Sequence, residues 1–94
     1  MAALTNVTLE SGGTVICNAP KGTLNDTTGK IKLTETTWPN ISARDQLAYL
    51  QKKVTLKAKL SRGAEPKRSY AKPMYIIGIT PGANEAQLAD KPES

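Results

Sequence analysis

The sequence predicts a mainly β protein, with a small antiparallel sheet, sandwich or partly open barrel, a long basic hairpin, at most one short helix and an extended C-terminal arm. Three observations predict this class. Residues 53–60 alternate strictly between apolar and polar, which is the period of a half-buried strand. Other segments rich in Thr and Val are separated by Gly, Asn, Asp and Pro clusters typical of turns. A chain of 94 residues can bury one core but not two.

The first forty residues are expected to form short strands. Three are predicted, over residues 4–9, 14–17 and 30–38. Unbroken alternation in the first would put Thr5, Val7 and Leu9 on one face. The Ser-Gly-Gly turn after it makes the first two strands a hairpin, and residues 19–22, which include a proline, are expected to end the second strand.

One short helix is expected at residues 43–51. Pro39 ends the strand before it, and Ser42 with Asp45 has the form of a capping box. Leu47 and Leu50 then fall at helical spacing. The weak alternation over residues 47–51 leaves an extended conformation open as the alternative.

The strongly alternating segment is expected to pair with residues 69–79 in a long hairpin. Apolar side chains on both faces of this return strand are typical of a central strand or of one covered by a partner. Pro73 cannot donate to a ladder, so pairing is expected to begin near Met74. The domain is therefore predicted over residues 1–82, and residues 83–94, with Leu88 as their single large apolar anchor, are predicted to be a tail or arm.

Positive charge is concentrated in residues 52–72, which hold eight bases and the single acid Glu65. The net charge of the whole chain is +5, so the other residues together are slightly acidic. A lysine face at strand spacing can neutralise phosphates, and it can equally contact an acidic protein or simply solvate a half-buried strand. The candidate phosphate or partner contacts are Lys53, Lys57, Lys59, Arg62, Lys67, Arg68 and Lys72.

No enzyme is expected, and no metal, cofactor or small-molecule substrate. The absence of His excludes a Ser-His-Asp nucleophile and an imidazole base. The eight acids are scattered singly, without metal or acid–base spacing. Cys17 cannot form an intramolecular disulfide and is expected to be a small buried side chain in a reducing compartment. Trp38 is expected in the core at a strand end.

The predicted core is thin for a monomer, because the chain has 4% aromatic residues and no Phe. Oligomerisation, or docking on a larger protein shell, is the usual remedy. The candidate assembly contacts are Met74, Tyr75, Ile77 and Leu88.

Two segments resemble known virion proteins. Residues 4–9, Leu-Thr-Asn-Val-Thr-Leu, and the hairpin from residues 54–60 to residues 75–77 are similar to the N-terminal strands of single-stranded RNA bacteriophage coat proteins. The chain also resembles, in style, the small β-rich cement or decoration proteins of tailed phages. The resemblance implies a virion structural protein and no particular site residue.

The sequence thus favours a non-enzymatic structural subunit of a phage-like particle, a small coat, cement or decoration protein. The alternative is a small β-barrel that binds single-stranded nucleic acid through the basic hairpin, and a small regulator of one acidic host protein is a third possibility. No signal peptide or membrane span is expected, since the longest apolar run, residues 74–79, is too short. We expect the protein in the virion, assembled in the host cytoplasm, or otherwise in the cytoplasm.

Overall fold

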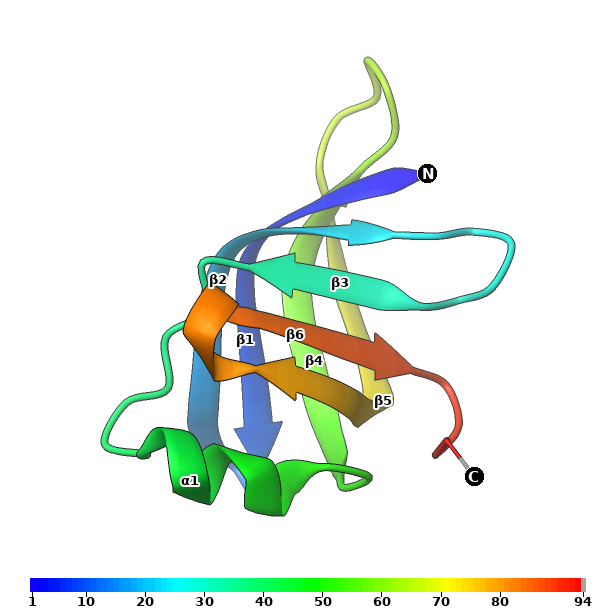
Figure 1. Ribbon diagram of the computed structural model, residues 1–94. Coiled ribbons are helices and arrows are strands. Elements are labelled where there is room, and N and C mark those ends of the chain that lie inside the picture. The colour runs from blue at the N-terminus through cyan, green and yellow to red at the C-terminus, as the bar shows by residue number, and fades with distance from the viewer. Residues whose placement is uncertain (94) are drawn as a thin grey trace.

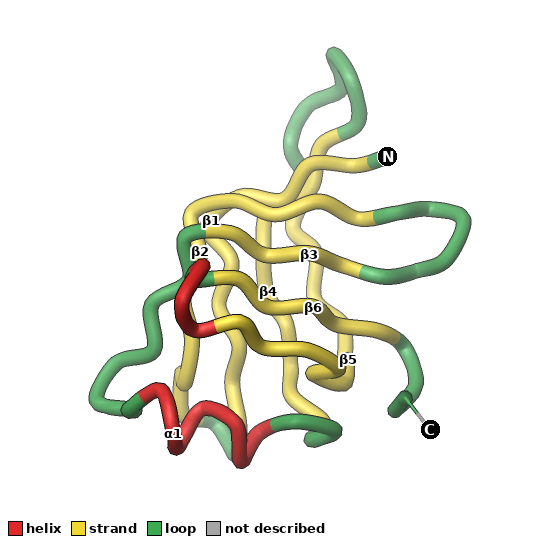
Figure 2. Tube along the Cα trace, viewed as in Figure 1, coloured by secondary structure: helices red, strands yellow, loops and turns green. Residues whose placement is uncertain are grey.

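The computed structural model describes residues 1–93 and is mainly β, as predicted. Its strands are β1 (Ala2–Ser11), β2 (Thr14–Leu24), β3 (Ile31–Thr34), β4 (Lys53–Ser61), β5 (Arg68–Thr80) and β6 (Glu85–Ala89). Its helical segments are α1 (Ala43–Gln46) and the 3-10 turns η1 (Leu47–Tyr49) and η2 (Pro81–Ala83). The strands close into a barrel with one end covered by α1 and η1, while the loop between β4 and β5 projects from the other end (Figures 1 and 2).

The barrel consists of two three-stranded meanders. Going around it, the strands follow the order β1-β2-β3-β6-β5-β4, and β4 pairs with β1 to complete the circle. All neighbouring strands are antiparallel. The spatial order β4-β1-β2-β3 is a Greek key, in which the long segment containing α1 returns the chain to lie beside β1. Closure leaves fewer unpaired strand edges than an open sheet would.

The core fills the barrel with aliphatic side chains from all six strands. The fully buried ones include Leu4, Leu33, Leu56, Ile76 and Leu88, each with no exposed surface. Trp38 is 8% exposed, so it is a core residue as expected, but it does not end a strand, because β3 stops at Thr34 and not near residue 38 as predicted. Among residues 1–93 the exposed large apolar side chains are Met1, Val15 and Leu47, so one chain encloses an aliphatic core by itself.

A bulge in β1 corrects the predicted face of this strand. Leu4 and Val7 are both buried, although they are three positions apart and would lie on opposite faces of a regular strand. The break lies at Asn6, whose φ of 51° is a left-handed conformation that Asn tolerates better than most residues. Thr5 pairs with Lys21 and Val7 pairs with Ala19. Asn6 and Pro20, which lie between these two pairs, are not paired. Pro20 therefore breaks no ladder bond, and β2 continues past the point where the sequence predicted its end.

The return strand also pairs earlier than expected. β5 pairs with β4 from Arg68 onward, and Pro73 lies opposite Thr55 within this ladder. Pairing of β5 with β6 begins only at Tyr75. Pro73 thus lies where β5 has a single neighbour, and a strand with one neighbour needs only alternate N–H groups. The prediction that pairing starts near Met74 was wrong for this reason.

The predicted C-terminal arm is largely a barrel strand. Residues 85–89 form β6, which pairs with β3 on one side and with β5 on the other. Ala86 and Leu88 point inward and have no exposed surface. The division at residue 82 is therefore wrong, because β6 is needed to close the barrel, and residues 90–93 lie beyond the end of this strand.

The predicted helix is confirmed as a short one. α1 and η1 together span residues 43–49, and the Ser42 hydroxyl accepts a hydrogen bond from the Asp45 backbone N–H at 3.2 Å. Behind the cap, Ile41, Tyr49 and Leu50 pack against the core. The helical segment covers one end of the barrel and holds Tyr49 beside Trp38, with ring centroids 6.0 Å apart.

Candidate functional site

The lysines of β4 share the outer face of the barrel, as the alternation predicted. Lys53, Lys57 and Lys59 are all exposed, whereas Val54 and Leu56 between them are buried. The three lysines therefore occupy outward positions along one strand, with Thr55 between Lys53 and Lys57. Residues two apart on a strand are separated by about 6.7 Å, which is the expected spacing between the Lys57 and Lys59 backbone positions.

The neighbouring strands add to this face. In the strand register Lys59 lies opposite Thr5 of β1, and Thr5 lies opposite Lys21 of β2. Opposed residues in antiparallel strands point to the same side, so Lys21, Thr5 and Lys59 form one row across three strands. Sequence reasoning missed Lys21, because only the barrel brings it beside the hairpin.

Acids from other strands neutralise much of the basic hairpin. Glu10 Oε2 lies 3.1 Å from Lys57 Nζ. Asp26 Oδ1 lies 2.8 Å from Arg62 Nη2, and Asp90 Oδ1 lies 2.8 Å from Lys72 Nζ. Within the hairpin Glu65 lies 3.8 Å from Arg68. Four of the eight bases in residues 52–72 are thus paired with acids. With these acids counted, the excess of positive charge on this segment falls from seven to four. The charge that remains for a partner is smaller than the sequence suggested.

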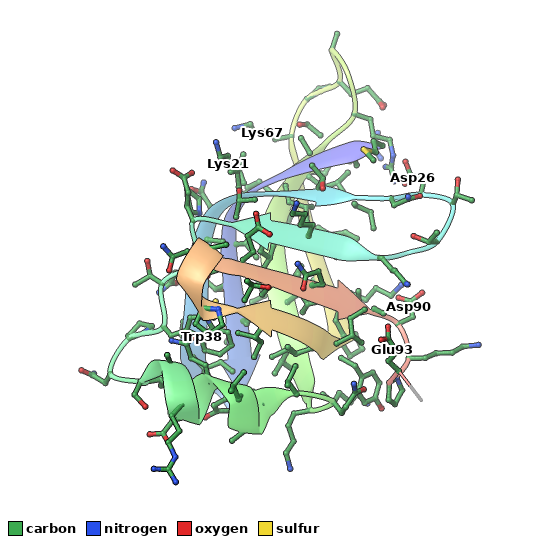
Figure 3. The ribbon with its side chains drawn as sticks, in the orientation of Figure 1. Lys21, Asp26, Trp38, Lys67, Asp90 and Glu93 are labelled. Atoms are coloured by element: carbon green, nitrogen blue, oxygen red, sulfur yellow. The ribbon has the colours of Figure 1, made fainter. Side chains whose placement is uncertain are left out.

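The seven candidate bases do not form a single surface. Lys72 lies opposite Leu56 in the register, so it projects to the side of the β4–β5 hairpin away from Lys57. The hydrogen bond from Lys72 to Asp90 raises the pKa of the lysine. Lys67 is exposed in the loop before β5 (Figure 3), and Arg68 is exposed as the first residue of that strand. The line along β4 is therefore the best-defined basic surface of the protein.

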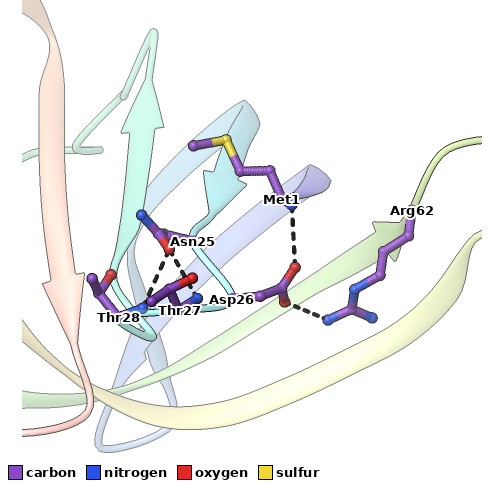
Figure 4. A network of polar contacts seen from close by, with 6 residues as sticks. All are labelled: Met1, Asn25, Asp26, Thr27, Thr28 and Arg62. Atoms are coloured by element: carbon purple, nitrogen blue, oxygen red, sulfur yellow. Dashed lines mark hydrogen bonds and ion pairs between the residues drawn. The ribbon is translucent and has the colours of Figure 1, made fainter.

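The loop between β2 and β3 is tied to the end of this hairpin. The Asp26 carboxylate accepts a hydrogen bond from the Arg62 guanidinium and lies 3.3 Å from the Met1 amino group (Figure 4). The Asn25 side chain of the same loop accepts from the backbone N–H groups of Thr27 and Thr28. Arg62 and the Met1 amino group lower the pKa of Asp26, chiefly through the hydrogen bond from Arg62. Arg62 is thus paired with a carboxylate of the β2–β3 loop.

The four candidate assembly residues separate into two groups. Met74 and Leu88 have no exposed surface, since both point into the barrel, so they are core residues and not contacts for a partner. Tyr75 and Ile77 are half-buried. Tyr75 lies opposite Lys53, on the outer face. Only these two remain as candidates for contact with another molecule.

Cys17 is a core residue, as expected. It has no exposed surface, and burial raises the pKa of its thiol to about 12. A thiol with this pKa is almost entirely protonated near neutral pH and reacts slowly, because the thiolate is the nucleophile.

An open depression beside α1 and η1 escaped the sequence analysis. It has a volume of about 540 Å³, and its lining includes Asn40, Asp45, Tyr49, Lys52 and Lys53. No local pattern marks it, because it forms only where η1, the start of β4 and the end of β1 meet. The paired lysines Lys52 and Lys53 were its one visible sign in the sequence.

The described residues show neither a metal site nor a membrane-spanning helix. Residues 1–93 contain no cluster of three acidic or Cys side chains that could hold a metal ion. Within the same part of the chain, every helix is too short or too polar to cross a membrane. No family model, curated protein or solved structure matches the chain. Its function must therefore be argued from the surface described above.

Proposed function

We propose that this protein binds single-stranded nucleic acid, without catalysing a reaction, through the outer face of β4. The observation that carries the proposal is the exposed line of Lys53, Lys57 and Lys59 on a strand of the closed barrel. Ammonium groups in a line contact successive phosphates and release counterions, which gives binding that is independent of sequence and sensitive to salt.

The ion pair on this face does not prevent such binding. Lys57 pairs with Glu10 at 3.1 Å, and the Lys57 side chain is 56% exposed. The Glu10 side chain is only 19% exposed, so water screens this pair incompletely and Lys57 is the least available of the three lysines. Lys53 and Lys59 have no acid within ion-pair distance in the described residues and can contact phosphates without breaking an ion pair.

The test is a titration of a labelled single-stranded oligonucleotide at several salt concentrations. Three phosphate contacts predict a slope of log affinity against log salt of about −2. The triple variant Lys53→Gln, Lys57→Gln, Lys59→Gln should lose most of this slope. The matched control removes the same charge from the other side of the barrel, with Lys30→Gln, Lys32→Gln and Lys91→Gln, and should retain it. Absence of binding at low salt, or equal loss in both triple variants, overturns the proposal.

The second proposal is a structural subunit of a phage-like particle, located in the virion. Tyr75 and Ile77 support it, because half-buried apolar side chains on β5 can be covered by a neighbouring subunit. Light scattering at two salt concentrations tests it. Self-association that persists at high salt supports assembly through apolar contacts. A monomer at high concentration, with no affinity for such particles, rules it out.

A further inference from the structure

The depression beside α1 and η1 continues the lysine line of β4. Lys53 belongs to both, since its side chain is exposed on the outer face of β4 and also lines the depression. Lys52, the next residue toward η1, lines it as well. Neither lysine has an acid within ion-pair distance in the part of the chain that the structure describes. A strand of nucleic acid that runs along β4 toward the covered end of the barrel is therefore led to this depression.

The lining combines the groups that a nucleobase requires. Tyr49 supplies an aromatic ring, and Ile41 beside it supplies an apolar wall. Asn40 supplies an amide, and Asp45 supplies a carboxylate that can accept hydrogen bonds from the amino group of a base.

The barrel holds the aromatic ring in place. Tyr49 packs against the core, and its ring centroid lies 6.0 Å from that of Trp38. A ring that is already fixed loses little conformational entropy when a base stacks on it. The Ser42 cap and the Leu50 N–H bond to the Leu47 carbonyl hold the backbone on both sides of this ring.

We propose that one base of the bound single strand inserts into this depression and stacks on Tyr49, while Lys52 and Lys53 bind the flanking phosphates. The proposal rests on the nucleic-acid function proposed above and adds a base-binding site to it. Stacking of a base on an aromatic side chain changes affinity by at least about fivefold. Such a site gives the protein a preference for unpaired bases that the lysine line alone does not provide.

The position of Trp38 provides a local readout. It is the only tryptophan of the sequence, and its ring centroid lies 6.0 Å from that of Tyr49, which lines the depression. A base stacked on Tyr49 is expected to alter the fluorescence of Trp38, whereas phosphate contact along β4 alone is not. Fluorescence thus reports on the depression, and a label on the oligonucleotide reports on total binding.

The experiment compares two probes on the unmodified protein: an oligodeoxycytidine of about ten nucleotides and an abasic strand with the same number of phosphates. The expected result is that both bind at low salt, the abasic strand at least about fivefold more weakly, and that only the oligodeoxycytidine alters Trp38 fluorescence. Equal affinity and no fluorescence change with either probe overturns the base site and leaves the lysine line intact. Failure of both probes to bind overturns the proposed function itself.

Substitutions locate the site. Tyr49→Leu removes the aromatic ring and should reduce oligodeoxycytidine affinity at least about fivefold, with no effect on the abasic strand. Tyr49→Phe keeps the ring and should bind as the unmodified protein does. Tyr70→Leu is the matched control, since Tyr70 also packs against the core but does not line the depression. An equal loss in Tyr49→Leu and Tyr70→Leu, with unchanged unfolding midpoints, contradicts a site at Tyr49.

Discussion

Asp26 accepts a hydrogen bond from Arg62 across 36 positions of sequence, with the Arg62 Nη2 nitrogen 2.8 Å from its carboxylate oxygen. This contact joins the loop between β2 and β3 to the end of the β4–β5 hairpin (Figure 4). Both groups are exposed at the surface. The pair therefore orients the loops at this end of the barrel and adds little to global stability.

The first prediction concerns the titration of Asp26. Its pKa lies below the ordinary value of 3.8, because Arg62 stabilises the carboxylate. The ion pair is therefore formed at pH values above 3.8 and is lost as the pH falls through the lowered pKa. Arg62→Gln should shift the titration midpoint of Asp26 upward, as followed by NMR of its carboxyl carbon. Lys67→Gln, in the same loop, should leave the midpoint in place. An unchanged midpoint in Arg62→Gln would show that the contact is not formed in solution.

The second prediction concerns the bulge in β1. Asn6 has a φ of 51°, which glycine adopts without strain and β-branched residues adopt only at a cost. Asn6→Val should lower the free energy of unfolding by about 1–2 kcal/mol, measured by urea denaturation. Asn6→Gly should be close to neutral. If the two variants unfold at the same urea concentration, β1 does not keep this bulge.

The bulge also explains why only part of the fold follows from the sequence. The face of β4 could be predicted because its alternation is unbroken from Lys53 to Leu60. In β1 the same reasoning failed, since one residue at Asn6 shifts the alternation and turns both Leu4 and Val7 inward. Local alternation contains no information about where a strand bends to close a barrel.

The candidate site, like the fold, could be predicted from the sequence only in part. The exposed lysines of β4 follow from periodicity alone. The ion pairs of Lys57, Arg62 and Lys72 do not, because Glu10, Asp26 and Asp90 reach these bases from other strands or loops only after the barrel closes. Likewise Tyr49 lies in a segment with no strong pattern, and its place beside Trp38 depends on how η1 covers the end of the barrel.

The third prediction concerns close packing of β2 on β3. A Cβ atom at Gly22 would lie 2.7 Å from Leu33 Cδ2 and 2.9 Å from the Lys32 carbonyl oxygen, and the latter belongs to the backbone. Gly22→Ala should destabilise the protein by about 1–3 kcal/mol in urea denaturation. Gly82→Ala is the control, because a Cβ there meets nothing within 4 Å. A neutral Gly22→Ala would contradict the pairing of Gly22 with Leu33.

The last prediction distinguishes a barrel strand from a tail. Leu88 lies opposite Ile31 in β3 and Ile76 in β5 and has no exposed surface, whereas a residue in a free arm would contribute almost nothing to folding. Leu88→Ala removes buried methyl groups and leaves a cavity, which costs about 2–5 kcal/mol. Leu47→Ala makes the same chemical change at a side chain that is 47% exposed and should cost far less. Thermal and urea unfolding of the two variants supply the comparison. Because β6 lies between β3 and β5, loss of Leu88 weakens both neighbours at once, so a broad, less cooperative transition should accompany the lower midpoint. Equal unfolding midpoints for the two variants would show that residues 85–89 are an arm and not a strand of the barrel.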